Sequence, residues 1–239
     1  MVASPPDAAL SYIKGSIAAV TSLSWVCDKK TWAATLITTG GKHYDHSITT
    51  PSLQHHNHQP MNLCIIRHGQ TDYNVQGLCN DNPHTQVNLT QQGIEQARAA
   101  ALALSDRAFD VIYISELPRT RQTAAIINDY HQAPVLQRRD LNDIRSGFDG
   151  EPVARYFAAV GHDRLNTVPP GGESLRQFQQ RVNGFIDELM LQPHRNVLVV
   201  AHEETLRVFA ARFRGLDDDA MQALSFANCE YLCFPAIGA

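Results

Sequence analysis

From residue 61 onward, short apolar runs alternate with longer segments of helical periodicity. The runs Leu63–Ile66, Val111–Ile114 and Val197–Ala201 have the length and composition of buried strands. The segments between and after them predict four helices. One starts at Thr90, and the others span Pro118–Tyr130, Glu173–Leu191 and Glu203–Arg214. Cys229–Phe234 is predicted as an edge or closing strand. Strands that alternate with helices favour a mostly parallel sheet with helices on both faces.

Residues 1–60 have a different pattern. Tyr12–Val20 and Thr31–Thr38 are rich in β-branched and aromatic residues, which is typical of strands, and Gly40-Gly41 predicts a turn before His43–Ile48. Pro51–Pro60 is polar and predicts a linker. We therefore expect a small β-rich or irregular accessory segment with its linker over residues 1–60, and one α/β domain over residues 61–239.

Composition adds few constraints on function. Apolar residues make up 44% and charged residues 18% of the 239 residues, which is typical of a globular protein. The net charge of −4 does not favour nucleic-acid binding. No apolar stretch is long enough to span a membrane, and Ile17–Val26 lacks the basic start and the cleavage site of a signal peptide. These features predict a cytoplasmic protein that binds neither nucleic acid nor membranes.

Cysteine and histidine usage gives no metal or disulfide signature. The chain has 5 cysteines and no pair at CxxC spacing, so neither a disulfide framework nor a thiolate zinc site is expected. His55, His56 and His58 are candidate metal ligands. Because no carboxylate or cysteine stands near them, we favour a solvated linker, and we expect no metal and no cofactor.

The candidate chemistry lies where the three predicted strands end. Arg67, His68 and Gly69 follow the first strand, and Ser115, Arg119 and Arg121 follow the second; His202, Glu203 and Arg207 follow the third. The carboxyl ends of parallel strands meet at one edge of a sheet. Buried arginine and histidine side chains are costly unless an anion compensates them, and arginine matches phosphate oxygens well. The pattern therefore predicts a phosphate pocket.

The motifs RHGQTDYN, NLTQQGIEQA, SELPRTRQTA, PPGGESLRQF and VLVVAHEETLR resemble the histidine phosphatase superfamily, in its phosphoglycerate-mutase-like branch, over residues 61–239. The resemblance implies a three-layer α/β/α sandwich and a phosphohistidine intermediate. By motif position, His68 is the expected nucleophile. Arg67, Arg119 and His202 are expected to hold the phosphoryl group, and Asn74 is expected to line the same pocket.

This chemistry is consistent with the residue types. Arg67 and Arg119 should disfavour a charged His68 and keep it nucleophilic. Together with His202 they can stabilise the negative charge of the transferring phosphoryl group, so that no metal is required. Water then releases phosphate from the phosphohistidine.

Two positions depart from the family pattern. The expected proton donor is Asp143, where the family has a glutamate, and the alternative donors are Asp140, Asp149 and Glu151. Glu203-Glu204 follows His202, where the family usually has glycine. A carboxylate there would weaken phosphate binding, so we expect Glu203 to point away and to stabilise the start of its helix.

The sequence favours a phosphatase that hydrolyses small phosphomonoesters. A cofactor-dependent phosphoglycerate mutase is the main alternative, but the segment from Gly150 to Gly171 is shorter than is usual for such mutases. A non-catalytic phosphate-binding module of the same fold, or a nucleic-acid-binding role for residues 1–60, are further alternatives. The physiological substrate and the oligomeric state stay open.

Overall fold

The computed structural model describes residues 20–28, 31–38, 43–48 and 60–237. The chain forms two compact units, Met1–Asn57 and His58–Ala239. In the first unit, β1 (Val20–Asp28), β2 (Thr31–Thr38) and β3 (His43–Ile48) form an antiparallel sheet in sequence order. The small β-rich segment is therefore confirmed. The strand expected before residue 20, the turn at Gly40-Gly41 and the histidines His55, His56 and His58 lie outside the described residues.

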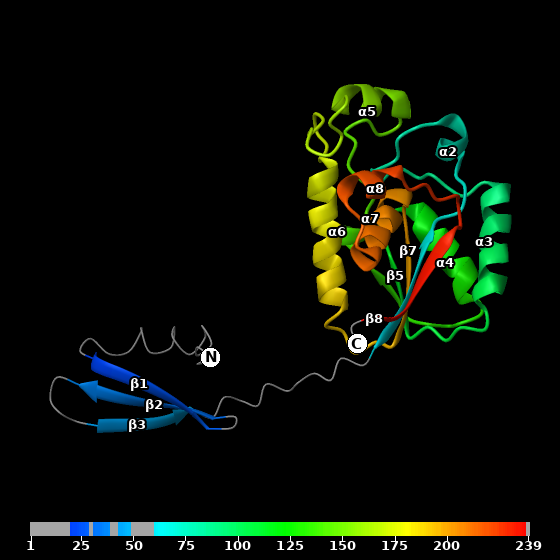
Figure 1. The fold of residues 1–239 in the computed structure, drawn as a ribbon. Helices are drawn as coiled ribbons and strands as arrows, with labels where there is room; N and C mark the ends of the chain where they lie inside the picture. The colour runs from blue at the N-terminus through cyan, green and yellow to red at the C-terminus, as the bar shows by residue number, and fades with distance from the viewer. Residues whose placement is uncertain (1–19, 29–30, 39–42, 49–59, 238–239) are drawn as a thin grey trace. The chain divides into compact units, whose positions relative to one another are not determined.

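The second unit contains a five-stranded sheet with the order β6-β5-β7-β4-β8 (Figure 1). Its strands are β4 (Met61–Arg67), β5 (Val111–Ile114), β6 (Val135–Gln137), β7 (Asn196–Ala201) and β8 (Tyr231–Ile237). All neighbours are parallel except β8, which pairs antiparallel with β4 at the edge of the sheet. The mostly parallel sheet is confirmed, and β8 is the predicted edge strand.

Alternation along the strands divides the core into two layers. Side chains such as Leu63 and Val199 point to the face covered by α6 (Leu175–Leu189), α7 (Glu203–Arg214) and α8 (Asp218–Ala223). Ile66 and Val200 point to the opposite face, covered by α3 (Gln91–Leu104) and α4 (Pro118–Asn128) (Figure 1). This is the three-layer sandwich that the resemblance implied. None of the helices in the described ranges is long and apolar enough to cross a membrane.

The long helices lie where the sequence predicts them, and side-chain caps set their starts. The hydroxyl of Thr90 accepts a hydrogen bond from the Gly93 amide at the start of α3. Helix α6 starts at Leu175, two residues later than expected, because Ser174 and Gln177 form a capping box.

Five short elements of the second unit were not predicted. They are α2 (Asp72–Gln76), β6, the 3-10 helix η1 (Arg139–Leu141), α5 (Val153–Val160) and α8. Three-residue β6 is exposed along its whole length, so it lacks the apolar run that marks the other strands. Helices α2 and α5 lie beyond the carboxyl ends of the parallel strands (Figure 1). Tyr156 and Val160 of α5 pack on Cys79 in a small apolar cluster separate from the two main layers.

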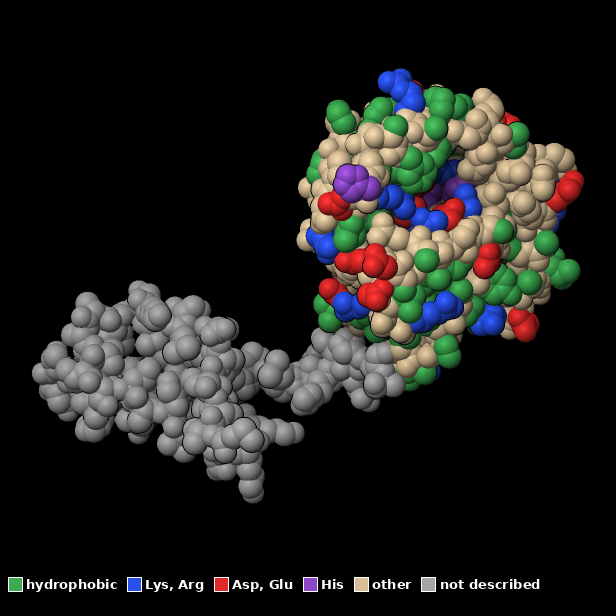
Figure 2. All heavy atoms as spheres, turned by 45° about the horizontal axis from the view of Figure 1, so that its top comes forward, with side chains coloured by type: hydrophobic (Ala, Val, Ile, Leu, Met, Phe, Trp, Pro, Cys, Tyr) green, Lys and Arg blue, Asp and Glu red, His purple; other side chains and the backbone are tan. Residues whose placement is uncertain are grey.

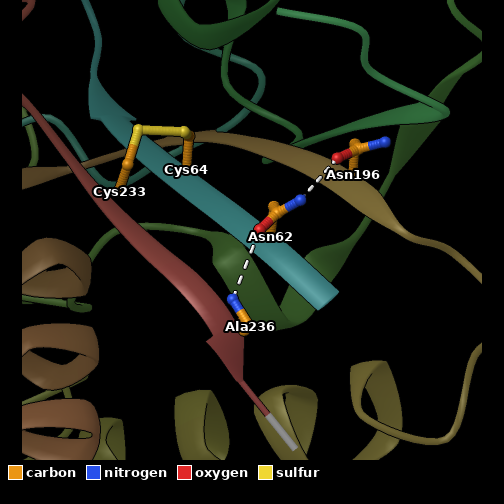
Figure 3. The surroundings of a disulfide bond; sticks show 5 residues. All are labelled: Asn62, Cys64, Asn196, Cys233 and Ala236. Carbon is orange, nitrogen blue, oxygen red and sulfur yellow. Dashed lines mark hydrogen bonds between the residues drawn. A yellow bond between two sulfur atoms is a disulfide. The ribbon is translucent and has the colours of Figure 1, made fainter. Parts of the chain in front are cut away.

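A disulfide joins Cys64 of β4 to Cys233 of β8 (Figure 3). The expectation of no disulfide was therefore wrong. The two cysteines are 169 residues apart, so no local spacing marks them, but the β4–β8 register places them opposite each other. Nearby, the side chain of Asn62 donates to Asn196 of β7 and accepts from the amide of Ala236 in β8 (Figure 3). Cys79 and Cys229 are free thiols.

We expect a chain that starts at Met61 to fold like the full chain, because both apolar layers are formed by residues after 60. Its midpoint of thermal unfolding, followed by circular dichroism, should lie within about 3 °C of the corresponding transition of the full chain, a shift equivalent to less than about 1 kcal/mol. A chain that starts at Cys64 is the control, because it lacks the buried Met61 and Leu63 and should be much less stable. An unfolded Met61 chain would contradict the prediction.

Candidate active site

Three neighbouring strands bring the predicted charged residues together. His68 follows β4, His202 follows β7, and Arg119 lies in the first turn of α4, after β5. Since β5, β7 and β4 are adjacent in the sheet, these three side chains meet at its carboxyl edge. All three are buried, with only 1–2% of each residue exposed.

Two glycines allow the loop after β4 to pack closely on α3. A Cβ atom at Gly69 would lie 2.5 Å from the carbonyl oxygen of Gly93, and one at Gly93 would overlap the backbone of Gln70. The Gly69 amide donates to the hydroxyl of Thr123, and the Gln70 carbonyl accepts from the Thr90 amide. These contacts hold the backbone on which His68 stands.

The imidazole of His68 is held neutral and oriented. Nδ1 lies 2.8 Å from the Gly69 carbonyl, which can only accept, so Nδ1 carries the hydrogen. Nε2 then has a lone pair, which accepts from Arg119 Nε at 2.9 Å. Burial, and next the positive charges of Arg119 and Arg67, hold the pKa of His68 well below its usual value. A neutral imidazole with Nε2 as the basic atom is the form that can attack phosphorus.

His202 is fixed in the other tautomer. Its Nδ1 lies 2.9 Å from Arg119 Nη2, which donates, so Nε2 carries the hydrogen and donates to the Ser115 hydroxyl at 2.9 Å. The Ser115 hydroxyl also lies 2.9 Å from that of Thr120. Burial and the charge of Arg119 hold the pKa of His202 well below its usual value too. The two rings stand edge to face with their centroids 5.3 Å apart.

Three arginines that line the cavity, Arg67, Arg119 and Arg207, each have a buried donor without a partner among the described residues, and in Arg207 this donor is Nε. Arg119 donates to both histidines and to the carboxylate of Asp143, but its Nη1 is buried without a hydrogen bond. Arg67 Nε is buried and unpaired as well. Burial lowers the pKa of Arg119 to about 10, so it stays charged at neutral pH. Unpaired, buried guanidinium nitrogens are costly, and the oxygens of an anion would satisfy them.

Asp143 is the acidic residue that faces this cluster. Its Oδ2 lies 2.9 Å from Arg119 Nη2 and 3.6 Å from His202 Nδ1. Burial raises the pKa of Asp143 to about 6, against the opposing effect of Arg119. The three alternatives are engaged elsewhere: Asp140 pairs with Arg138, Asp149 accepts from the 81–85 loop, and Glu151 pairs with Arg155.

A buried ion pair supports the segment that carries Asp143. Glu173 is 2% exposed and pairs with Arg181 of α6, so it does not lie at the pocket rim. Arg181 also donates to the carbonyls of Asp140 and Asn142, at 2.8 and 3.0 Å. Glu173 Oε1 accepts from the Arg145 amide at 3.1 Å, so the pair orients the backbone both before and after Asp143.

Asn74 lies at the edge of the pocket, on α2. Its Oδ1 accepts from the Thr71 amide in a capping box and from the side chain of Asn228. The side chain thus joins α2 to the segment before β8. Contact with a phosphate remains a prediction for this residue.

Glu203 departs from its expected orientation. It does begin α7, as predicted, but its carboxylate turns toward the pocket instead of away from it. Oε2 lies 2.9 Å from Arg67 Nη1, and Oε1 accepts from Arg207 at 2.7 Å. A fixed negative charge therefore stands beside one of the two arginines that the sequence assigns to phosphate.

Of these side chains, those of Arg67, His68, Arg119, Asp143 and Glu203 line a cavity of about 270 Å³, whereas His202 is buried and does not line it. Figure 2 shows a hollow in which basic, acidic and histidine side chains gather. A larger hollow of about 750 Å³ lies beside it, lined by Arg121, Arg139 and Arg145, but neither His68 nor His202 lines that hollow. Among the residues that the structure describes, no three His, Cys, Asp or Glu side chains form a metal-binding group.

The sequence did not reveal the wall of the cavity on the side of α5. It is formed by Tyr156 and Phe157 of α5, Arg164 in the loop that follows, and Glu204 and Arg207 of α7. Arg207 and Glu204 were noted as residues after the third strand. Tyr156, Phe157 and Arg164 belong to segments that meet α7 only in the folded chain, and no local motif marks them.

The model of the histidine phosphatase superfamily (branch 1) matches residues 63–235. Adenosylcobalamin/alpha-ribazole phosphatase from Escherichia coli K12 is 35% identical over 171 residues, which cover 67% of this chain and 83% of that protein. A 2,3-bisphosphoglycerate-dependent phosphoglycerate mutase from Cytophaga hutchinsonii is 34% identical over 179 residues, which cover 70% of this chain and 83% of the mutase.

Solved structures show the same fold. The crystal structure of a putative alpha-ribazole-5'-P phosphatase from Escherichia coli has a TM-score of 0.64 and 32% identity, covering 70% of this chain and 86% of that one. Mycobacterial glucosyl-3-phosphoglycerate phosphatase, solved as a complex with VO3, has a TM-score of 0.62 and 27% identity, covering 72% and 90%.

We predict that Glu203→Gln strengthens the binding of inorganic phosphate. Removing a negative charge about 3–6 Å from the anion should lower the inhibition constant of phosphate roughly tenfold, since such pairs interact by about 1–3 kcal/mol at a protein surface. The measurement is competitive inhibition of aryl phosphate hydrolysis. Glu151→Gln is the matched control, because Glu151 also pairs with an arginine but lies outside the cavity. Weaker phosphate inhibition in Glu203→Gln would show that the carboxylate mainly holds Arg67 in place.

Proposed function

This chain belongs to the histidine phosphatase superfamily, and on that premise we propose that it hydrolyses small phosphomonoesters through a phosphohistidine at His68. One observation carries the proposal: the neutral, oriented Nε2 of His68 lies beside the unpaired buried nitrogens of Arg119 and Arg67. A nucleophile and anion-binding donors therefore share one cavity. Phosphatases are also among the similar proteins of known structure and sequence.

In the first step, the His68 Nε2 lone pair forms a bond to phosphorus while the ester P–O bond breaks. The anionic oxygens of the phosphoryl group accept from Arg67 and Arg119, which stabilises the transition state. His202 acts through Arg119, because its Nδ1 accepts from Arg119 and its Nε2 hydrogen is donated to Ser115. Asp143, protonated, gives its proton to the leaving alkoxide. In the second step, Asp143 takes a proton from water as the water oxygen attacks phosphorus, and phosphate and free His68 are released.

Mutase activity is the second candidate, because a phosphoglycerate mutase is 34% identical to this chain. A mutase must retain a bisphosphate beside the phosphohistidine, which adds negative charge to the pocket. Glu203 and Glu204 already place two carboxylates on the cavity wall. We therefore favour water as the acceptor. Release of phosphate from an aryl phosphate, compared with conversion of 3- to 2-phosphoglycerate, separates the two activities.

We further propose that the substrate is a small phosphorylated molecule and that the enzyme acts in the cytoplasm. The names of the similar phosphatases, which act on alpha-ribazole and glucosyl-3-phosphoglycerate phosphates, support a small organic leaving group. Disulfides are more common in oxidising compartments, so finding the full chain with an oxidised Cys64–Cys233 pair only in an exported fraction would overturn the cytoplasmic proposal.

We predict that His68→Ala abolishes turnover and leaves the fold intact. When the reaction of the wild type with radiolabelled substrate is quenched with base, the protein should carry a phosphate that is stable in base and labile in acid. The variant should carry none. The control is His84→Ala, which removes an imidazole outside the cavity. An alanine variant at residue 68 that turns over like the wild type would exclude His68 as the nucleophile.

We predict that Asp143→Asn slows hydrolysis of an alkyl phosphate by roughly 10²–10⁴-fold, the usual contribution of general acid catalysis. An aryl phosphate with an acidic leaving group needs little protonation, so its loss should be much smaller. Since the pKa of Asp143 is about 6, its acid form is lost as pH rises through 6. The wild-type rate of the first step with an alkyl phosphate should therefore fall above that pH. His68 is already neutral at this pH, so its protonation adds no further pH dependence there.

The contrast between substrates is the control for Asp143→Asn. Equal losses on alkyl and aryl phosphates would assign Asp143 a structural role. No loss on either would move the proton transfer to another carboxyl group, with Glu203 and Glu204 the nearest to test because they line the same cavity.

A further inference from the structure

The cavity has a second wall that the proposed chemistry does not use. It lies on the side of α5 and consists of Tyr156, Phe157, Arg164, Glu204 and Arg207, which we call the outer wall. Glu204 and Tyr156 line the same cavity as Asp143. Because Asp143 is the proposed proton donor to the leaving group, the outer wall faces the leaving group and not the phosphoryl group.

One carboxylate oxygen of Glu204 accepts hydrogen bonds, and the other accepts none. Oε1 accepts from Arg164 Nη2 at 2.5 Å and from Arg207 Nη1 at 2.7 Å. Oε2 is buried and has no hydrogen-bond partner among the described residues. Burying a carboxylate oxygen without a hydrogen-bond donor costs more free energy than burying a neutral acceptor without one. The structure therefore presents an acceptor that a ligand with a donor would satisfy.

The arginines of the outer wall are already neutralised by these carboxylates. Arg207 pairs with Glu203 and Glu204, and Arg164 pairs with Glu204. Each of the three pairs is 2.5–2.7 Å long, and the side chains are 12–23% exposed. A carboxylate or second phosphate on the leaving group would have to displace Glu204 to reach Arg164 Nη2 or Arg207 Nη1, and the donor of Arg207 that is not paired, Nε, is buried. An anionic leaving group is thus disfavoured at this wall.

The rest of the outer wall is aromatic. Arg164 lies over the rings of Tyr156 and Phe157, at 5.8 and 5.4 Å from their centroids. Leu78 and Val153 also line the cavity. The rings and the two aliphatic side chains offer apolar contact to a carbon skeleton, and the hydroxyl of Tyr156 is the polar group that they add.

We propose that Glu204 is a specificity-determining residue, which selects phosphomonoesters whose leaving group carries a hydrogen-bond donor, a hydroxyl or an ammonium, and rejects leaving groups that carry a carboxylate. The inference rests on the proposed phosphatase function. The donor would bind Glu204 Oε2, while the carbon skeleton packs on the aromatic rings.

The test compares matched substrates on the full-length wild type. sn-Glycerol 3-phosphate, which has two hydroxyls, should exceed propyl phosphate in kcat/KM by about 10- to 100-fold, the usual effect of a hydrogen bond to a charged group. Ethanolamine phosphate compared with ethyl phosphate tests the ammonium in the same way, and shows which donor is preferred. 3-Phosphoglycerate should be the poorest of the three-carbon substrates.

Glu204→Gln tests the residue itself. The ratio of kcat/KM for glycerol phosphate to that for propyl phosphate should fall to within about threefold of unity, since an amide oxygen accepts a weaker bond than a carboxylate. The ratio excludes any general effect on folding or on Asp143. Glu188→Gln is the matched control, because Glu188 pairs with Arg138 on the exposed surface of α6, and its ratio should match that of the wild type.

The outcomes separate this inference from the proposed function. If the wild type hydrolyses an aryl phosphate and forms phosphohistidine but treats glycerol phosphate and propyl phosphate alike, the role of Glu204 is wrong and the function stands. A preference for 3-phosphoglycerate would also overturn the proposed role of Glu204. If neither aryl hydrolysis nor phosphohistidine is seen, the proposed function itself fails. If Glu204→Gln does not fold, the kcat/KM ratios of the matched substrates on the wild type still test the proposed preference for a donor.

Discussion

The buried guanidinium of Arg119 is the interaction on which the site depends. It donates to His68, His202 and Asp143, each at 2.9 Å, so it sets the positions of three side chains from three separate segments. Its charge also helps to keep both imidazoles neutral, while burial brings the pKa of Asp143 into the range useful for proton transfer. A buried cation is costly without an anionic partner, and one carboxyl that protonates near pH 6 compensates it only in part. Affinity for a phosphoryl group follows from that imbalance.

Much of this arrangement could be predicted from sequence because it depends on strand ends. Buried strands are visible as apolar runs, and the carboxyl ends of parallel strands share one edge. Arg67-His68, Arg119 and His202 each follow such a run, so their convergence needed no knowledge of distant contacts. Asp143 could be located only through the family motif, since its segment is irregular and its orientation depends on the contact of Arg181 with the backbone.

The features that the sequence did not predict depend on contacts between distant segments. The orientation of Glu203 is set by Arg67, which is far away in the sequence, so the helix-start argument gave the right position and the wrong direction. Glu204 and Arg164 meet because the loop after α5 folds onto α7. Helix α5 is amphipathic, with Tyr156 and Val160 buried, but its eight residues make a short periodic segment that the sequence pattern alone did not mark. The specificity that we propose, unlike the proposed phosphate chemistry, thus depends on pairs of residues that have no common motif.

The Cys64–Cys233 bond closes the catalytic unit into a covalent ring. All residues proposed for chemistry, from His68 to His202, lie within the ring, and so do Glu204 and the outer wall. A single cut by a protease in any exposed loop of the ring, such as the one between α5 and α6, would leave both fragments joined. The nicked enzyme would then migrate as one chain until a reductant separates it. The bond therefore gives the site a tolerance to backbone cleavage that the hydrogen bonds of β4 and β8 alone would not provide.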